Sequence, residues 1–155
     1  MSRLYLAFAL SVTVQFTPNC FAADEMDGKF GDTVFIGFEG EQNWPTSANA
    51  QVIEDSSVPI YIGLPTKEYQ VLGRIIDPRS SGIGVVGRYF SEGLFSEKDR
   101  QRDCANQAKF RGGDAVLVTG DERVLSALNL TRAEVAKTTP LFHYRDKVTL
   151  VIKFK

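Results

Sequence analysis

The stretch Ser96–Thr119, SEKDRQRDCANQAKFRGGDAVLVT, decides the fold, because it predicts a helix, a double-glycine stop and a buried strand. Ser96 can accept hydrogen bonds from the free backbone amides of the first helical turn. Glu97 and Asp99 follow in that turn, where acidic side chains lie favourably against the positive end of a helix. The start of this helix is therefore encoded locally.

The helix has one face of small residues. Helical spacing places these residues in a stripe, which consists of Cys104, Ala105, Ala108 and Gly112. Small side chains let a helix lie close to a sheet, so we expect the stripe to face strands. Gly112 and Gly113 can close the helix, and Ala115–Val118 is apolar without alternation, as in a strand covered on both faces.

The first 22 residues have the layout of a secretory signal peptide. Arg3 supplies a short basic head, Leu4–Phe16 is an apolar run, and Cys20-Phe21-Ala22 precedes Ala23. The run is shorter than the roughly 20 apolar residues that span a bilayer. Acylation of Cys20 would require a leucine and small residues before it, and Thr17-Pro18-Asn19 lacks them. We therefore expect a soluble, periplasmic or secreted protein that is cleaved after Ala22.

Composition limits the function classes. Removing residues 1–22 leaves 133 of the 155 residues, which is the size of one domain, and a single cysteine, Cys104, which has no partner for an internal disulfide. Eight acidic residues and one lysine lie between Asp24 and Asp55, whereas the later part of the chain is mildly basic. A sequence pI of about 5.9 and the absence of a compact Lys/Arg run argue against nucleic-acid binding.

Other segments predict further strands and a second helix. Thr131-x-x-Glu134 is a capping box and predicts a short helix over about residues 132–137. Val58–Leu64 and Tyr69–Ile76, separated by four residues, predict a hairpin, in which Gly73 marks a bulge or the close approach of another backbone. We expect further strands at Thr33–Phe38, Ala50–Ile53 and Val148–Phe154, an edge strand at Leu141–Tyr144, and a short helix or bent strand at Val124–Leu130.

These elements predict an α+β fold. We expect a single domain in which a mixed or antiparallel sheet carries the main helix, about residues 96–112, and the short second helix. The predicted boundaries are a signal peptide at 1–22, an acidic N-terminal segment with the first strand at 23–57, and an α/β core at 58–155.

A glycine-rich string does not indicate a nucleotide site. Gly82, Gly84 and Gly87 have the spacing G-x-G-x-x-G, but no helix opens on the last glycine and no acidic residue ends a following strand. We interpret the string as a loop or irregular strand and expect no cofactor.

The residues with chemical potential do not form a recognisable catalytic set. Cys104 lies on the small apolar helix face, where a packing cysteine is expected, and His143 is the single histidine. The acidic pairs Glu39 with Glu41 and Asp121 with Glu122 have no apolar setting. The candidates for ligand binding are three aromatic residues of predicted loops, Trp44, Tyr89 and Phe90. We expect Trp44 to fold back over the core.

The order of three segments resembles a known bacterial pattern. Val58–Leu64 is followed by Tyr69-x-x-Leu72-Gly73-x-Ile75 and by a helix that ends in Ala108-x-x-x-Gly112-Gly113-Asp114-Ala115-Val116. This resembles the pattern Y-x-x-(L/I)-G-x-(V/I) … A-x-x-x-G-A-D-A-V of small domains such as the YbjQ-like family and the Rcs stress-sensor lipoproteins (RcsF-like). The resemblance covers residues 58–119 and implies a β-hairpin packed with a helix and further strands, in a cell-envelope setting.

Two properties of those families have no counterpart in the sequence. The Rcs sensors use disulfides and a lipid anchor, whereas the mature chain has one cysteine. The YbjQ-like family is associated with oligomers and metal binding, but no His/Cys cluster is present to bind a metal. The resemblance therefore implies fold and setting, and we predict no metal site.

The sequence favours a non-enzymatic function. We expect an exported binding or structural module of the bacterial cell envelope, whose partner is an envelope protein. Two alternatives stay open: a thiol-dependent hydrolase that uses Cys104 and His143, and a metal-binding envelope protein that uses His143 with nearby acids.

Overall fold

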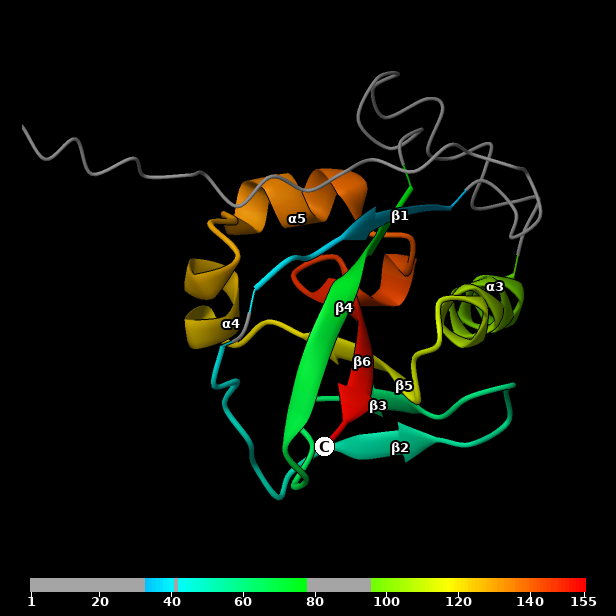
Figure 1. Ribbon diagram of the computed structural model, residues 1–155. Coiled ribbons are helices and arrows are strands. Elements are labelled where there is room, and N and C mark those ends of the chain that lie inside the picture. Colours follow the sequence, from blue (N-terminus) through cyan, green and yellow to red (C-terminus); the bar gives the residue numbers. More distant parts are fainter. Residues whose placement is uncertain (1–32, 41, 78–95) are drawn as a thin grey trace, which may run out of the picture.

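The computed structural model describes residues 33–40, 42–77 and 96–155 and has an α+β fold (Figure 1). The predicted fold class is confirmed, because a six-stranded mixed sheet carries one main helix and shorter helices in a single domain. The predicted signal peptide, Glu41, the glycine-rich string, Tyr89 and Phe90 lie outside the described residues. The elements are β1 (Val34–Gly37), β2 (Gln51–Ile53), β3 (Ile60–Ile62), β4 (Tyr69–Ile76), α3 (Glu97–Phe110), β5 (Ala115–Thr119), α4 (Glu122–Ala127), α5 (Arg132–Thr138), the 3₁₀ helix η1 (Phe142–Tyr144) and β6 (Val148–Phe154).

The sheet has the strand order β1-β4-β6-β5-β3-β2. Only the pairing of β3 with β5 is parallel, and the other described neighbours pair antiparallel. The chain leaves β4, passes through α3 and returns in β5, and β6 then inserts between these two strands. The last strand of the chain is therefore at the centre of the sheet.

The predicted hairpin of Val58–Leu64 with Tyr69–Ile76 is wrong. The two segments contain β3 and β4, but β6 and β5 lie between those strands in the sheet. All five residues of β5 and the first five of β6 are buried, so these strands must occupy central positions. The shorter and less buried β3 is displaced toward the edge, where it pairs with β2.

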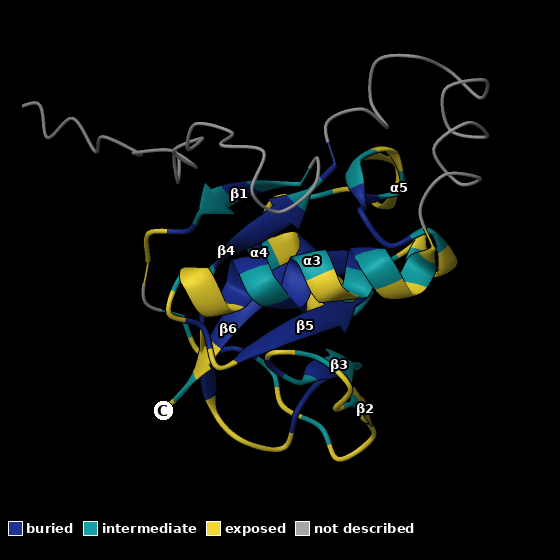
Figure 2. Ribbon diagram, turned by 90° about the vertical axis from the view of Figure 1, so that its right-hand side faces the viewer, coloured by how far each residue is buried: buried dark blue, intermediate teal, exposed yellow. Residues whose placement is uncertain are grey.

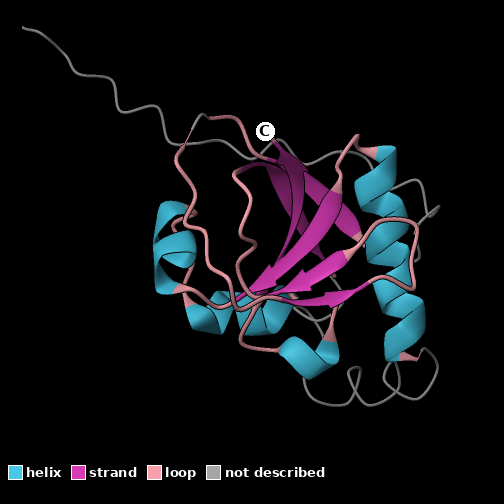
Figure 3. Ribbon diagram, turned by 90° about the horizontal axis from the view of Figure 1, so that it is seen from below, coloured by secondary structure: helices cyan, strands magenta, loops and turns pink. Residues whose placement is uncertain are grey.

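The sheet has a hydrophobic core on each face, and Figure 3 shows helices on both sides of the strands. In β5, Ala115 and Leu117 belong to one core, and Val116 and Val118 belong to the other. This alternation explains why the strand is apolar throughout, as predicted. α3 covers one core, and α4 and α5 cover the other.

The main helix α3 packs on the sheet with its buried side toward the strands (Figure 2). Cys104, Ala105 and Ala108 are completely buried, which confirms the predicted small face at these three residues, whereas the fourth predicted member, Gly112, is exposed and lies after the end of α3. Ser96 caps the start of the helix and accepts a hydrogen bond from the Asp99 amide at 3.1 Å.

The double glycine ends α3 in a Schellman motif. The Gly112 amide donates to the Lys109 carbonyl at 3.1 Å, and the Gly113 amide donates to the Ala108 carbonyl at 2.9 Å. Gly112 has φ of +74°, which a residue with a side chain adopts only at a cost. The two glycines have different functions, because a Cβ on Gly113 would lie 2.4 Å from the Val151 side chain.

A bulge in β4 reverses the direction of its side chains. The register with β6 shifts between Val71 and Gly73. Val71 therefore belongs to the core under α4 and α5, whereas Ile75 belongs to the core under α3, although the two residues are four apart. The bulge predicted from Gly73 is confirmed, and the groups that approach this glycine are the Phe35 ring and the Ile36 carbonyl of β1.

Leu141–Tyr144 is a turn of 3₁₀ helix rather than the predicted edge strand. Contacts with α3 favour the turn. The Glu97 carboxylate accepts a hydrogen bond from the Phe142 amide at 3.2 Å, and the Arg100 guanidinium lies over the Phe142 ring at 3.9 Å. These long-range contacts outweigh the strand propensity of the local sequence.

We predict that Gly73→Ala destabilises the protein by about 1–3 kcal/mol through overpacking. The new Cβ would lie 2.3 Å from the Phe35 ring and 2.5 Å from the Ile36 carbonyl oxygen, and a backbone atom cannot move aside freely. Urea unfolding measures the change in the free energy of unfolding.

Gly37→Ala is the matched control, because Gly37 is the register partner of Gly73 on β1. Its Cβ would lie 3.8 Å from the Phe35 ring, which is an ordinary contact. We expect a change of less than about 1 kcal/mol. Equal effects of the two substitutions would contradict the predicted contact at Gly73.

Candidate functional site

Cys104 is completely buried in the layer between α3 and the sheet. Burial raises the pKa of the Cys104 thiol well above its ordinary value, and the negative charges of Asp103 and Glu97 act in the same direction. The reactive thiolate is therefore strongly disfavoured. This environment fits the predicted packing cysteine.

His143 lies on η1 with its side chain 76% exposed. Its Nδ1 is 3.9 Å from Oε1 of Glu97, the first residue of α3. Among the described residues, no hydrogen bond or ion pair joins His143 to Cys104. The structure thus brings the histidine to a carboxylate, and a Glu97–His143 pair replaces the Cys104–His143 pair considered from the sequence.

Glu97 is held at the boundary between the interior and a hollow. Its side chain is 13% exposed, and Oε2 accepts the hydrogen bond from the Phe142 amide. Oε1 is buried and has no hydrogen-bond partner within the described part of the chain. Burial raises the pKa of Glu97, and this effect exceeds the opposing influence of His143, of the backbone amides of His143 and Phe142, and of Arg100. The negative charge on this carboxylate is poorly compensated.

The hollow beside Glu97 has a volume of about 470 Å³. Among the described residues, three separate segments line it: the end of β2 with the loop that follows, the first turns of α3, and η1. The lining residues are Ile53, Asp55, Ser56, Ser96, Glu97, Lys98, Asp99, Gln101, Arg102 and His143. This volume is within the range of about 300–1,000 Å³ that small-molecule sites occupy.

The other charged groups around the hollow already form ion pairs. Lys98 lies 2.8 Å from Asp55, and Arg102 lies 2.9 Å from Asp99. Both pairs are exposed and thus contribute little to stability. Their charges are nevertheless matched, which leaves Glu97 as the poorly compensated group.

Below the hollow, a buried ion pair fixes the first turns of α3. The Arg100 guanidinium donates to the Asp77 carboxylate at 3.0 Å, and the two side chains are 5% and 3% exposed. Arg100 also donates to the Pro140 carbonyl at 3.4 Å and stacks on Phe142. The same side chain therefore positions both α3 and η1, the two elements that bring Glu97 and His143 together.

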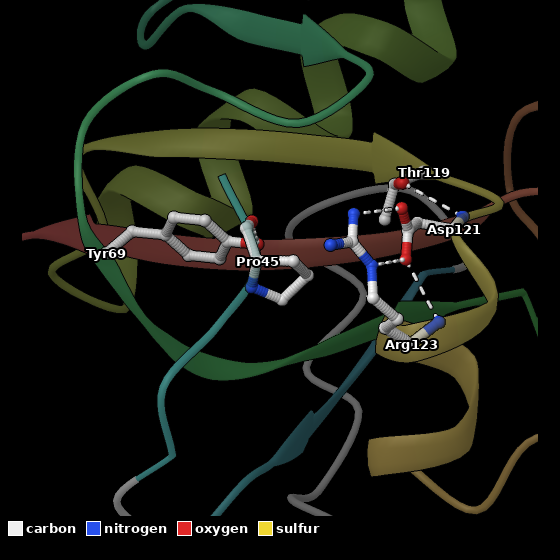
Figure 4. A network of polar contacts seen from close by, with 5 residues as sticks. All are labelled: Pro45, Tyr69, Thr119, Asp121 and Arg123. Carbon is white, nitrogen blue, oxygen red and sulfur yellow. Dashed lines mark hydrogen bonds and ion pairs between the residues drawn. The ribbon is translucent and has the colours of Figure 1, made fainter. Parts of the chain in front are cut away.

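A second polar region lies on the other face of the sheet, the face that α4 covers (Figure 4). The buried Tyr69 hydroxyl donates to the Pro45 carbonyl at 3.0 Å. Burial raises the pKa of Tyr69 strongly, and the Asp121 charge adds to the effect. Asp121 caps α4 and binds the Arg123 side chain through both carboxylate oxygens at 3.0 and 2.8 Å.

The contacts of this region fix loops and a helix start. Asp121 is occupied by Arg123, and Glu122 accepts a hydrogen bond from Arg132 at 2.7 Å. Accordingly, the Arg123 contacts lower the pKa of Asp121, and this carboxylate is not poised to act as a base. The other acid considered from the sequence, Glu39, is exposed.

Trp44 folds back over the core, as expected. It is 8% exposed and contacts the Phe38 ring edge to face at a centroid distance of 5.5 Å. Its indole Nε1 is buried without a hydrogen-bond partner among the described residues. The ring also lines a polar hollow of about 260 Å³ together with Asn43, Thr46, Glu68, Tyr69 and Lys155. The indole face is thus used for packing rather than presented as an open platform.

The described residues contain neither a cluster of metal ligands nor a membrane-spanning helix. Within residues 33–40, 42–77 and 96–155, no group of three or more His, Cys, Asp or Glu side chains could hold a metal ion. In the same ranges, no helix combines the length and the apolar character needed to cross a bilayer.

No protein-family model, curated protein or solved structure matches this chain. The site is therefore interpreted from its own contacts. Sequence reasoning assigned Glu97 only to the helix dipole, because its contacts, Phe142 and His143, follow 45 residues or more later. In the sequence, the one feature that pointed to Glu97 was its position immediately after the helix cap Ser96.

We predict that Cys104 is unreactive in the folded protein. In the chain without residues 1–22, Ellman's reagent should label no thiol before denaturation and the Cys104 thiol afterwards, because burial excludes both reagent and thiolate. Ser126→Cys, at an exposed position of α4, is the control and should react in the folded state. Rapid native labelling of Cys104 would contradict its burial and revive a thiol mechanism.

We also predict that Asp77→Asn destabilises the protein by about 3–5 kcal/mol, because Arg100 would stay buried without its counter-charge. Asp55→Asn removes one partner of the exposed pair with Lys98 and should leave the free energy of unfolding almost unchanged. Chemical denaturation measures the free energy of unfolding of both variants. Similar losses in the two would contradict the prediction that the buried Arg100–Asp77 pair is more sensitive to the loss of one partner than the exposed pair.

Proposed function

We propose that this chain is an exported, non-enzymatic binding module of the bacterial cell envelope, and that its binding surface is the hollow beside Glu97. Two features of the sequence support the setting. Residues 1–22 have the layout of a signal peptide, and residues 58–119 resemble YbjQ-like and Rcs sensor-like envelope domains. The expected partner is an envelope protein.

The binding proposal rests on the way in which the hollow is built from the described residues. Its lining comes from three segments that are far apart in the sequence. Two of them, α3 and η1, are fixed to each other by Arg100, which is buried and ion-paired. A firmly positioned polar surface requires little ordering when a partner binds, and this favours recognition.

The environment of the reactive groups supports binding over thiol catalysis. The Cys104 thiol is buried with a raised pKa, and His143 contacts a carboxylate instead of the thiol. A nucleophilic mechanism requires an accessible, activated nucleophile beside its base. The described residues supply an accessible hollow but no such pair.

Site-specific photo-crosslinking in bacterial cells tests the proposal. The chain is produced with residues 1–22, and p-benzoylphenylalanine replaces Gln101, which lines the hollow. We expect an envelope-fraction adduct from this position, and mass spectrometry should find a mature chain that begins at Ala23.

The matched control places the same photoreactive residue at Ser126, an exposed position of α4 on the opposite face of the sheet. This position should give no adduct. A chain that stays in the cytoplasm with residues 1–22 intact contradicts the export proposal. Equal adducts from both positions contradict the assignment of the hollow as the binding surface.

A further inference from the structure

Glu97 distinguishes the hollow from an ordinary charged surface. Its Oε1 atom is buried and accepts no hydrogen bond from the described residues. His143 Nδ1 is 3.9 Å from this oxygen, which exceeds hydrogen-bond distance, and the other groups that favour the charge of the carboxylate are the backbone amides of Phe142 and His143 and the Arg100 guanidinium. A buried carboxylate oxygen without a donor is costly, so a ligand that supplies a donor gains free energy from this site.

The balance of charge identifies the kind of donor. Lys98 and Arg102 are neutralised by Asp55 and Asp99, so the ion pairs at the rim leave Glu97 as the remaining anionic group. A positively charged donor matches this group better than a neutral donor, because charge-assisted hydrogen bonds are the stronger ones. An anionic ligand would meet three carboxylates in the same lining.

On the basis of the binding function proposed above, we propose that the hollow receives a lysine or arginine side chain of the partner protein, with the Glu97 carboxylate as its counter-ion. The hollow of about 470 Å³ is large enough for one such side chain. Ile53 provides an apolar contact for the methylene groups, and Asp55 and Asp99 offer further acceptors at the rim.

His143 controls access to the carboxylate. The imidazole lines the hollow and is largely exposed, so it can rotate away without disturbing the core. The incoming cation then takes the place beside Oε1.

Binding should therefore weaken in acid. The ligand requires ionised Glu97, and protonation of this carboxylate removes the counter-ion. The charged groups that face Glu97 are His143 from η1 and Arg100 from α3, with Asp55, Lys98, Asp99 and Arg102 around the hollow. Because burial raises the pKa of Glu97, affinity should fall at a higher pH than it would for an exposed glutamate.

The test is an NMR titration of the full mature chain with Nα-acetyl-arginine amide, and the neutral isostere Nα-acetyl-citrulline amide is the control ligand. The arginine probe should give saturable shifts of the Glu97 side-chain carboxyl carbon and of the Phe142 and His143 amides. The citrulline probe should bind at least about tenfold more weakly, the factor expected for one charge-assisted hydrogen bond. No saturable shift with arginine, or equal affinity for both probes, overturns the proposal.

Two variants assign the effect to the carboxylate. Glu97→Gln keeps the shape but removes the charge, and it should weaken arginine binding at least about tenfold. Glu122→Gln, which removes an exposed carboxylate paired with Arg132, should leave binding unchanged. An amide spectrum confirms that each variant is folded, and unchanged affinity in folded Glu97→Gln overturns the proposal.

Failure of this inference is distinguishable from failure of the proposed function. Crosslinking through position 101 reports contact with any partner, whereas the arginine titration reports the chemistry at Glu97 alone. Crosslinking without arginine binding would retain the binding module and reject the cationic anchor.

Discussion

The buried ion pair between Arg100 and Asp77 is the interaction on which the arrangement at the hollow depends. Asp77 follows β4, and its amide donates to the Thr138 carbonyl at the end of α5. Arg100 extends from α3 to this carboxylate and also contacts Pro140 and Phe142. One buried charge therefore ties the sheet, the main helix and the segment before β6 together. A pair this deeply buried costs desolvation, so it is better understood as fixing geometry than as adding stability.

This constraint explains why a carboxylate and a histidine from distant parts of the chain meet. Arg100 is one helical turn after Glu97, and its contact with Phe142 holds η1 against the start of α3. The Phe142 amide then satisfies one oxygen of Glu97 and leaves the other beside His143. Other buried polar atoms of the described residues, such as Trp44 Nε1 and Thr149 Oγ1, also lack a hydrogen-bond partner, but Glu97 is the carboxylate among them and it lines the hollow, which is where a binding role is sought.

The sequence predicted the features that depend on neighbouring residues. The cap at Ser96, the stop at Gly112 and the capping box at Thr131 are all present, because each requires only contacts within a few residues. The fully buried β5 was also recognisable from its continuous apolar character. The hairpin prediction was wrong because a local turn signal carries no information about later strands. In the sheet, β6 lies next to β4 and β5 lies next to β3, so β3 and β4 do not pair. The sequence did not predict the pairing of Glu97 with η1 for the same reason, because the residues that contact Glu97 lie 45 or more positions later in the chain.

Burial separates Cys104 from His143, the two reactive groups that were considered together from the sequence. The small face of α3 that carries Cys104 lies flat on the strands, so the thiol is enclosed by the same packing that holds the helix in place. Glu97 lies seven residues earlier on α3, two turns away, where the helix reaches the edge of the sheet and Ile53 and His143 border open space. The helix thus places its thiol in the core and its carboxylate at the surface. Because His143 is at the carboxylate end, its contact is with Glu97 rather than with the sulfur of Cys104.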